Sequence, residues 1–351
     1  MKDFFNKAQQ QLDKKLPFVL YSKSGSDKIE GLLQQNDTLF QTEEFTENGF
    51  VMVSFDGKEK ILIPEHQSEK ISVSKKLTGE TDDTIPKKTY TEHAKSDFEA
   101  LVKKGIDAIN DKAFGKVVLS RTEIHELHDF DCLSIYEKIL NTYPNAYCYC
   151  FFHPKTGLWL GATPEKLLHV KNGKFQTMAL AGTQQFQQAE EVIWENKEKE
   201  EQQFVTDFIL ENLENVTSDI AISNPYTYRA GNLLHIKTDI EGSIDADSTL
   251  KHLLDILHPT PAVCGLPKKS AKVFIIANEG YNRSFYSGFL GEINLENKTD
   301  LFVNLRCMEI KDNRAHLFIG CGITKDSDPE KEFEETVNKS MTMKKILNQN
   351  L

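Results

Sequence analysis

The sequence contains six cysteines but no Cys-x-x-Cys pair, and no cysteine and histidine spacing typical of a zinc site. Most of the cysteines stand in apolar, strand-like stretches: Cys132, Cys148, Cys150, Cys264, Cys307 and Cys321. Cysteines in such stretches are usually reduced core residues, which argues against a disulfide framework and a structural metal. We therefore expect a protein of the reducing cytoplasm.

The chain also lacks hydrophobic runs and positive charge. Its first twenty residues contain no apolar segment like that of a signal peptide, and no later stretch is apolar enough to cross a membrane. The formal net charge of -11 argues against general nucleic-acid binding and against anionic membrane surfaces. We expect neither partner. An anionic substrate would have to be held by cations and backbone N–H groups placed locally.

The 351 residues, 39% hydrophobic and 27% charged, are typical of a globular protein with a large core. Strand-like residues 147–152 and 158–162 flank a turn, and residues 300–310 and 315–323 form a second predicted hairpin. Helical patterns lie between such hairpins. The pattern predicts an α+β fold with antiparallel sheets rather than a doubly wound one.

The organisation along the chain suggests two parts. Residues 68–95 are rich in Lys, Ser, Thr and Asp and poor in apolar residues, which predicts a linker or a loose surface loop. We expect residues 1–92 to form an N-terminal portion of the same α+β fold and residues 93–351 to form the main domain.

Two predicted helices carry carboxylates at helical spacing. The first spans about 328–350 and begins at Asp328-Pro329, a helix-start signal. On it Glu332, Glu335 and Lys339 stand at i, i+3 and i+7 and share a face. The second spans about 190–216 and carries Glu198 and Glu201. If the helices face each other, four carboxylates converge, and an all-oxygen site suits Mg²⁺. Taken alone, however, these residues are more typical of a solvated helix face.

Several single residues allow both a structural and a functional interpretation. Lys116 opens an apolar strand and is either a strand-edge lysine or a general base whose pKa is lowered by burial. Glu165 is either a first-turn helix glutamate or an acid whose pKa is raised by burial. Arg306, in an apolar strand-like stretch, needs an anionic partner. His235 is more typical of a hydrogen-bonded core histidine than of a ligand contact.

Taken together, motifs over about residues 95–345 resemble the chorismate-utilising enzymes, namely isochorismate, salicylate, anthranilate and aminodeoxychorismate synthases. The motifs occur in the family's order and spacing. They are Lys-Val-Val-Leu-Ser-Arg (116–121), Gly-Ala-Thr-Pro-Glu-Lys-Leu-Leu (161–168), Leu-Ala-Gly-Thr (180–183), His-Pro-Thr-Pro-Ala (258–262), Arg-Ser-Phe-Tyr-Ser-Gly (283–288), Leu-Arg-Cys (305–307), Gly-Cys-Gly-Ile (320–323) and Asp-Pro-Glu-Lys-Glu-Phe-Glu-Glu-Thr-Val-Asn-Lys (328–339).

The resemblance implies large antiparallel sheets packed as a sandwich with helices outside, and a chorismate-binding catalytic domain over residues 93–351. It implies a water-activating role for Lys116 and a general-acid role for Glu165. It implies Mg²⁺ as cofactor, with Glu201 and Glu335 as principal ligands and Glu198 and Glu332 as the accompanying pair. The residues it places on the substrate are Gly182, Thr183, His235, Ala262, Tyr286, Arg306, Gly320, Gly322 and Lys339.

Within the family, Lys116 indicates water rather than ammonia as the nucleophile. His-Pro-Thr-Pro-Ala is similar to isochorismate synthases, whereas salicylate synthases carry a threonine-bearing segment at residues 261–263. The resemblance therefore implies a monomeric isochorismate synthase, an isomerase that feeds menaquinone or siderophore biosynthesis. A salicylate synthase that also eliminates pyruvate, and a non-catalytic dicarboxylate-binding relative, are the alternatives. Two departures are Gln202, where many members have His, and Gly280, where many have Pro.

Overall fold

The structure is a computed structural model that describes residues 1–75, 88–128, 130–185, 192–214, 216–230 and 233–347. Its α-helices are α1 (Lys2–Asp13), α2 (Glu92–Asn110), α3 (Cys132–Thr142), α4 (Asn196–Leu213), α5 (Leu250–Leu257), α6 (Lys268–Asn278) and α7 (Pro329–Leu347). Its strands are β1 (Phe18–Ser22), β2 (Lys28–Gln34), β3 (Phe40–Gln41), β4 (Gly49–Val53), β5 (Lys60–Pro64), β6 (Ser68–Ser74), β7 (Lys116–Glu126), β8 (Tyr147–His153), β9 (Gly157–Thr163), β10 (Lys166–Lys171), β11 (Lys174–Gln185), β12 (Ile220–Ile222), β13 (Tyr226–Ala230), β14 (Leu233–Ser243), β15 (Gly265–Leu266), β16 (Phe289–Leu295), β17 (Lys298–Val303), β18 (Cys307–Lys311) and β19 (Arg314–Ile323).

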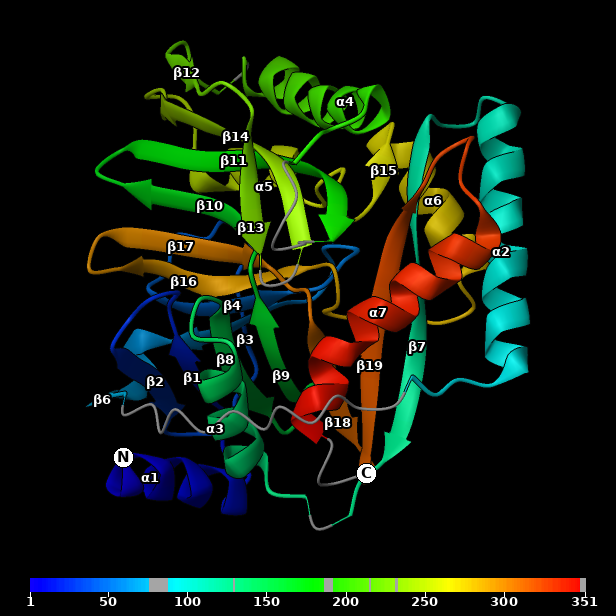
Figure 1. Cartoon of the computed structure of the whole chain (residues 1–351). Helices are drawn as coiled ribbons and strands as arrows, with labels where there is room; N and C mark the ends of the chain where they lie inside the picture. Colours follow the sequence, from blue (N-terminus) through cyan, green and yellow to red (C-terminus); the bar gives the residue numbers. More distant parts are fainter. Residues whose placement is uncertain (76–87, 129, 186–191, 215, 231–232, 348–351) are drawn as a thin grey trace.

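The strands form two large antiparallel sheets (Figure 1). The first sheet has nine strands in the order β15-β7-β19-β18-β9-β8-β1-β2-β6. The second has ten, with the path β12-β14-β11-β10-β17-β16-β4-β5-β3 and β13 paired to β14 beside it. This arrangement confirms the predicted α+β class, because helices are added to antiparallel sheets instead of alternating with parallel strands.

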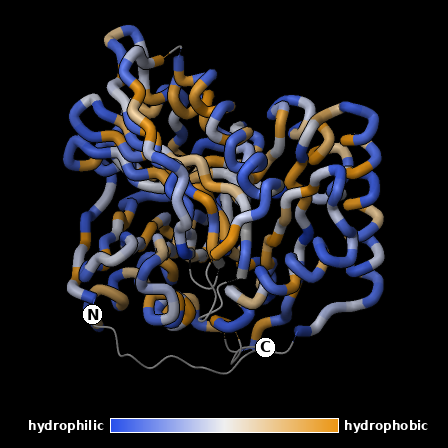
Figure 2. Tube along the Cα trace, turned by 45° about the horizontal axis from the view of Figure 1, so that its top comes forward, coloured by the Kyte–Doolittle hydropathy of each residue, from blue (hydrophilic) through white to orange (hydrophobic). Residues whose placement is uncertain are grey.

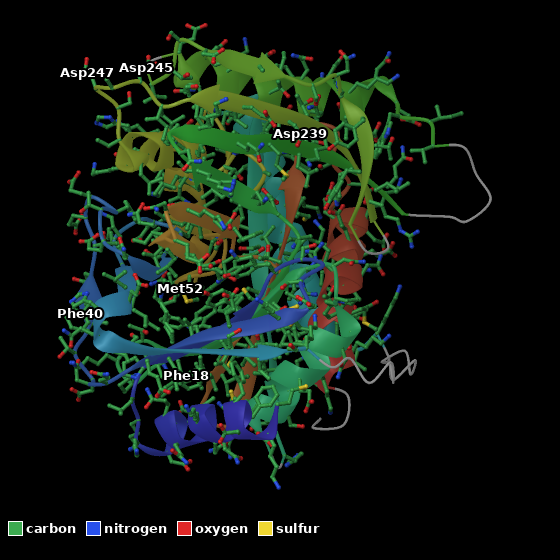
Figure 3. The ribbon with its side chains drawn as sticks, turned by 90° about the vertical axis from the view of Figure 1, so that its left-hand side faces the viewer. Phe18, Phe40, Met52, Asp239, Asp245 and Asp247 are labelled. Atoms are coloured by element: carbon green, nitrogen blue, oxygen red, sulfur yellow. The ribbon has the colours of Figure 1, made fainter. Side chains whose placement is uncertain are left out.

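Apolar side chains between the sheets hold the sandwich together. A cluster rich in aromatic residues joins strands of both sheets. Its members include Met52, Trp159 and Phe302. Other clusters lie on the outer faces, where α1 and α3 cover the first sheet and α4 and α5 cover the second. Figure 2 shows hydrophobic stretches along the central strands and hydrophilic ones in the outer loops. In Figure 3, Phe18 lies on the face of the first sheet that α1 covers. Met52, from the second sheet, lies on the opposite side of the first sheet, between the two.

The N-terminal residues build parts of both sheets, since β1, β2 and β6 join the first and β3, β4 and β5 the second. The predicted linker over residues 68–95 is wrong at both ends. Ser68–Ser74 form β6, in which Ile71 and Val73 alternate with polar residues and pack against the first sheet's outer core. Helix α2 begins at Glu92 with Thr91 as its N-cap. Residues 76–87 lie outside the described part of the chain, and the division at residue 92 stays a prediction.

The predicted single strand over residues 300–310 is also wrong. Strand β17 ends at Val303 in the second sheet, and β18 begins at Cys307 in the first. Between them the chain crosses from one sheet to the other, and Arg306 takes a left-handed backbone with φ 48°. A strand cannot continue through that conformation. The crossing places Arg306 between the end of a strand of one sheet and the start of a strand of the other.

Helix α7 follows the prediction closely at its start. The Asp328 carboxylate accepts hydrogen bonds from the backbone N–H groups of Glu330 (3.0 Å) and Lys331 (3.1 Å), as an N-cap does. The helix runs to Leu347 and packs on β19 and α2. The predicted helix over residues 190–216 is shorter, since α4 spans Asn196–Leu213; residues 190 and 191 lie outside the described part.

Among the described helices, none combines the length and the apolar character needed to span a membrane.

We predict that Gly265→Ala lowers the free energy of unfolding by more than about 3 kcal/mol, because large effects arise where a side chain has no space. Gly265 has φ 130°, and a Cβ there would stand 2.2 Å from the carbonyl oxygen of Lys116. Gly57→Ala is the matched control, since Gly57 also has positive φ but open surroundings. Its cost is about 1 kcal/mol of backbone strain. Urea unfolding of both variants measures the difference, and equal losses would contradict the steric argument.

Candidate functional site

Lys116 joins the first sheet to α4. It is the first residue of β7, and its side chain is largely buried, with its Nζ 2.5 Å from Oε1 of Glu201. Gly322 of the neighbouring strand β19 leaves room for this side chain, because a Cβ at residue 322 would stand 3.2 Å from Cε of Lys116. The pair therefore links a predicted base to a predicted metal ligand across the gap between strand and helix.

Glu165 follows strand β9 and is buried. Its backbone is fixed to the end of β17, since the carbonyl of Glu165 accepts a hydrogen bond from the N–H of Val303 (3.0 Å). Burial raises the pKa of the Glu165 carboxyl to about 7, although the positive charges of Arg306, Lys116 and Lys339 act to lower it. A carboxyl of this kind holds a proton near neutral pH and can donate it.

Arg306 stands at the crossing between the sheets, and its own carbonyl accepts a hydrogen bond from the N–H of Ala162 (3.0 Å). Burial lowers the pKa of its guanidinium, while the ionised forms of Tyr286, Glu335 and Glu165 would act against this effect. The expectation that Arg306 needs an anionic partner fits these surroundings. Its planar donors are suited to a carboxylate brought between the two sheets.

The β19 side of the site has an open edge. Pairing between β18 and β19 ends at Met308 and Leu317, so the described strands leave the next residues of β19 without a partner on that side. The Nζ of Lys339 on α7 donates to the carbonyl of Gly320 (3.0 Å) and lies 2.6 Å from Oε1 of Glu335. Lys339 thus contacts both the strand edge and the Glu335 carboxylate.

The carboxylates of α7 differ in their electrostatics. Burial would raise the pKa of Glu335, but the charge and hydrogen bond of Lys339, with Arg306 and His235, outweigh it and lower that pKa. Burial raises the pKa of Glu332, and the like charge of Glu335 adds to the rise. The predicted shared face of Glu332, Glu335 and Lys339 is present, since all three are partly buried beside a fully buried row that includes Phe333 and Thr336.

The second sheet contributes His235 and Gly182. The Nδ1 of His235 lies 2.9 Å from the carbonyl oxygen of Gly182 and therefore donates to it. Burial lowers the pKa of His235 to about 4, and the charges of Lys339 and Arg306 contribute in the same direction. Gly182 has φ 68°, and a Cβ there would stand 3.1 Å from Cβ of Glu198, so glycine lets α4 approach. Thr183 belongs to β11, but its side chain lies outside the described part.

Tyr286 and Ala262 lie at the border of the site. The Tyr286 ring stacks on Phe318 with centroids 5.4 Å apart, and its hydroxyl would stand 2.9 Å from a Cβ at Gly320. Burial raises the pKa of Tyr286 to about 12. Ala262 lies in the turn before β15, whose Leu266 pairs with Lys116. Ala262 is thus linked to the site through the chain, four residues before the partner of Lys116. Tyr286 lies against Gly320 of the site itself.

The acidic side chains of α4 and α7 supply oxygen donors of the kind that bind a divalent cation. In the described part of the chain, no three Asp, Glu, His or Cys side chains converge as one ion would require. Glu201 and Glu335 are each paired with a lysine, whereas Oε2 of Glu198 is buried without a hydrogen-bond partner. A buried carboxylate oxygen without a partner is costly, and hard oxygen donors are those that Mg²⁺ prefers. By donor chemistry the set fits such an ion.

Gln202, a departure from the resemblance, does not face the carboxylates. It is buried, and its Nε2 donates to the hydroxyls of Thr206 (2.9 Å) and Thr238 (2.7 Å). The residue therefore fastens α4 to β14.

Sequence reasoning missed a buried ion pair that organises this region. Arg283 and Glu279 lie 2.5 Å apart and are both almost completely buried. Arg283 donates to the carbonyls of Val118 (2.7 Å) and Val263 (2.9 Å), and Glu279 accepts from the N–H of Ser120 (2.7 Å). The pair joins the strand of Lys116 to the turn of Ala262. The only sign of this ion pair in the sequence is the i, i+4 spacing of two opposite charges, Glu279 and Arg283.

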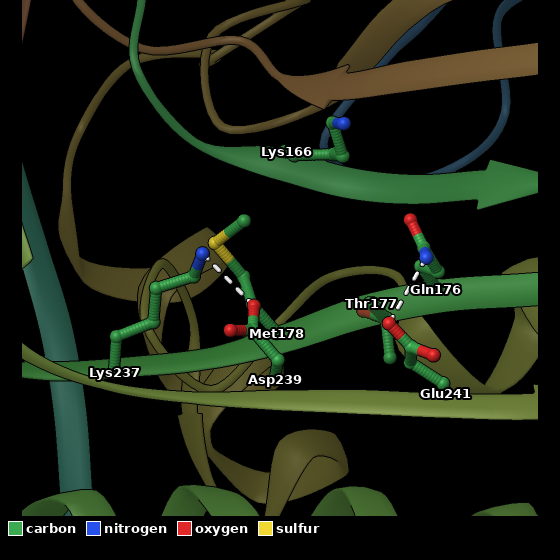
Figure 4. A pocket seen from close by; sticks show the side chains of 7 residues that line it. All are labelled: Lys166, Gln176, Thr177, Met178, Lys237, Asp239 and Glu241. Carbon is green, nitrogen blue, oxygen red and sulfur yellow. Dashed lines mark hydrogen bonds and ion pairs between the residues drawn. The ribbon is translucent and has the colours of Figure 1, made fainter. Parts of the chain in front are cut away.

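An open cavity of about 170 Å³ lies beside the site on the second sheet (Figure 4). Its lining residues are Lys166, Gln176, Thr177, Met178, Lys237, Asp239 and Glu241. None belongs to the predicted set, but Lys166 follows Glu165 and Lys237 follows His235 by two residues on β14. Residues at i and i+2 of a strand share a face, so the cavity continues the site's sheet surface.

Comparison with known proteins gives a family match over most of the chain. A family described as chorismate binding enzyme matches residues 49–348. The salicylate biosynthesis isochorismate synthase of Pseudomonas aeruginosa is 31% identical over 259 residues, which are 71% of this chain and 54% of that protein. The chain therefore matches about half the length of that relative.

Two solved structures share the fold. Escherichia coli MenF, a menaquinone-specific isochorismate synthase, has a TM-score of 0.78 at 21% identity, over 94% of this chain and 88% of its own. Anthranilate synthase component I of Streptococcus pneumoniae has a TM-score of 0.68 at 20% identity, over 93% of this chain and 90% of its own. The same fold thus occurs in proteins named for different activities, so the fold alone does not distinguish between those activities.

We predict that Arg306→Met raises the pKa of Glu165 above its value of about 7. The lost positive charge removes a cause that lowers this pKa, and a change of about one pH unit is usual for such a neighbour. Because a carboxyl is protonated below its pKa, Glu165 would keep its proton to higher pH in the variant. Carbon-13 NMR of labelled glutamate, assigned with Glu165→Gln, measures it. Arg314→Met, at the exposed end of β19, is the control, and an unchanged or lower pKa would contradict the argument.

Proposed function

The chain belongs to the chorismate binding enzyme family, and from that membership and the site geometry we propose that it is an isochorismate synthase. The observation that carries the proposal is the buried Glu165 carboxyl, with Lys116 near enough for its charge to act on that carboxyl. Glu165 retains a proton near neutral pH, and the charges of Lys116, Arg306 and Lys339 all act on it. A carboxylic acid and an amine near one another can serve the two proton transfers that the isomerisation requires.

In the proposed mechanism, the Nζ of Lys116 accepts a proton from the water that attacks C2 of chorismate. Glu165 donates its proton to the hydroxyl that leaves C4 as water, and the ring double bonds shift. One water enters and one leaves, so the net reaction is an isomerisation. Arg306 and Lys339 would bind the enolpyruvyl carboxylate through charge-assisted hydrogen bonds. The backbone of β19 at Gly320 and Gly322 would supply further contacts.

Mg²⁺ is the proposed cofactor. Glu201 and Glu335 would hold it, with Glu198 and Glu332 as the accompanying pair, and the buried unpaired oxygen of Glu198 supports this assignment. When bound, the ion would supply a Lewis acid and a template for the ring carboxylate. Gly182 and His235 would border that carboxylate on the second sheet, with Thr183 beside them, and Tyr286 and Ala262 would line the ring.

The proposed cellular setting is a cytoplasmic monomer that acts on a small molecule and feeds menaquinone or siderophore biosynthesis. Six buried, free cysteines support a reducing compartment. Lys116 supports water rather than ammonia as the nucleophile, because by resemblance the ammonia-using members lack this lysine.

Turnover of chorismate tests the proposal directly. With Mg²⁺, we expect a product of unchanged mass and new retention time in chromatography with mass detection. Lys116→Ala and Glu165→Gln should each lower kcat by about 100-fold or more, the usual worth of a general acid or base. Lys311→Ala, at an exposed position on β18, is the control and should leave the rate unchanged.

Other products would redirect the assignment. Salicylate and pyruvate would indicate a salicylate synthase, and an aminated product with ammonium would contradict the role of water. Binding of chorismate with no turnover would indicate a non-catalytic relative.

We also predict that Lys116→Met tightens Mg²⁺ binding about tenfold, which corresponds to about 1.4 kcal/mol. The Nζ of Lys116 lies 2.5 Å from Oε1 of Glu201, so a cation held by that carboxylate must compete with it. Calorimetric titration of substrate-free protein with MgCl₂ measures the affinity without relying on turnover. Lys311→Met is the control, and weaker binding by the Lys116 variant would rule out competition.

A further inference from the structure

Helix α7 carries more of the proposed site than any other described helix, including Glu332, Glu335 and Lys339. Its apolar side chains Phe333 and Val337 pack into a core shared with α2 and β7. Apolar packing is non-directional, so it determines which face of α7 is buried better than where the helix lies along its axis. Directional bonds must set that position, and a group of buried charges supplies them.

The first contact of this group comes from Arg121 on β7. Its Nε donates to Oγ1 of Thr336 (2.8 Å), and its guanidinium lies 5.0 Å from the ring centroid of Phe333. Thr336 is fully buried and adjacent in sequence to Glu335. A shift of α7 along its axis would break this hydrogen bond and leave a buried guanidinium N–H without a partner, which is costly.

The second contact lies in the last turns of α7. Lys344 is only 1% exposed, forms an ion pair with Glu123 of β7, and donates to the carbonyl of Thr89 (3.1 Å). Glu123 also lies 3.4 Å from both terminal nitrogens of Arg121 and 3.0 Å from Nε2 of His125. One carboxylate therefore joins the cations of both contacts.

The two contacts grip α7 at separated points. Thr336 and Lys344 are eight residues apart, which corresponds to about 12 Å of helix. Lys339 lies between them, and Glu335 precedes the first. Buried charges are tolerated when they are paired. A shift of α7 that separated Lys344 from Glu123, or Arg121 from Thr336, would leave a buried charged group without one of its partners and is therefore strongly disfavoured. Burial alone would raise the pKa of Glu123, but its partners His125, Lys344 and Arg121 outweigh burial and hold the pKa at about 2.

We propose that Arg121, Glu123 and Lys344 form a clamp that positions α7, and with it Glu335 and Lys339, for substrate and metal binding. These are positioning residues, because the contacts described for them are with α7, its neighbours and one another. The inference rests on the proposed function for its catalytic consequence. The placement of α7 itself can be tested without turnover.

The test uses Thr336 as a matched pair of variants. Thr336→Val keeps the shape and removes the hydroxyl that Arg121 bonds, while Thr336→Ser keeps the hydroxyl. We expect Thr336→Val to speed amide hydrogen exchange in α7 by about tenfold and to raise the KM for chorismate by about fivefold or more. Thr336→Ser should restore both values to within about twofold of the parent. Thr299→Val, at a buried and hydrogen-bonded threonine of β17, controls for general destabilisation.

Glu123→Gln provides a second route, because it removes the charge shared by Arg121 and Lys344, and we expect changes in the same direction. The proposal is overturned if Thr336→Val and Glu123→Gln lower the melting temperature but leave α7 exchange and KM as in Thr299→Val. If the parent protein does not convert chorismate, the proposed function fails, while the hydrogen-exchange comparison still decides whether the clamp holds α7.

Discussion

Charge compensation among buried and partly buried side chains is the constraint on which the rest of this structure depends. The protein carries a net charge of -11, yet it keeps Glu165 buried and Glu201 and Glu335 partly buried. Such groups are tolerated where cations and hydrogen bonds compensate them. Lys116 pairs with Glu201 and Lys339 with Glu335, while Arg306 acts on Glu165. The same cations that balance the carboxylates are the groups that suit an anionic substrate.

The fold meets this constraint by distributing the site over both sheets. Lys116, Gly320, Gly322 and α7 belong to the first sheet and its helices, whereas Gly182, His235 and α4 belong to the second. An aromatic core lies between the sheets. The chain crosses from one sheet to the other at Arg306, and the described strands leave the β18 side of β19 open beyond Leu317. The charged groups of the site therefore come from both sheets and from distant parts of the sequence.

Much of the local structure could be predicted, because its causes lie within a few residues. The Asp328 cap, the shared face of Glu332, Glu335 and Lys339, and the strand from Lys116 follow from local patterns and agree with the structure. The errors arose where tertiary contacts decide. Ile71 and Val73 make a strand of an apparently polar stretch because β2 lies beside them, and Arg306 leaves the strand conformation at the crossing between sheets.

The sequence by itself determined which chemical groups are available and which of them share a helix face, since helical spacing is a local property. Only the tertiary structure decided which cation meets which carboxylate on α4 and α7. It also decided that burial raises the pKa of Glu165 to about 7, that Gln202 turns to β14, and that Arg121 and Lys344 contact α7 and β7. The physical reason is that Coulomb interaction and desolvation depend on distance and burial in space. Neither quantity can be read from separation along the chain.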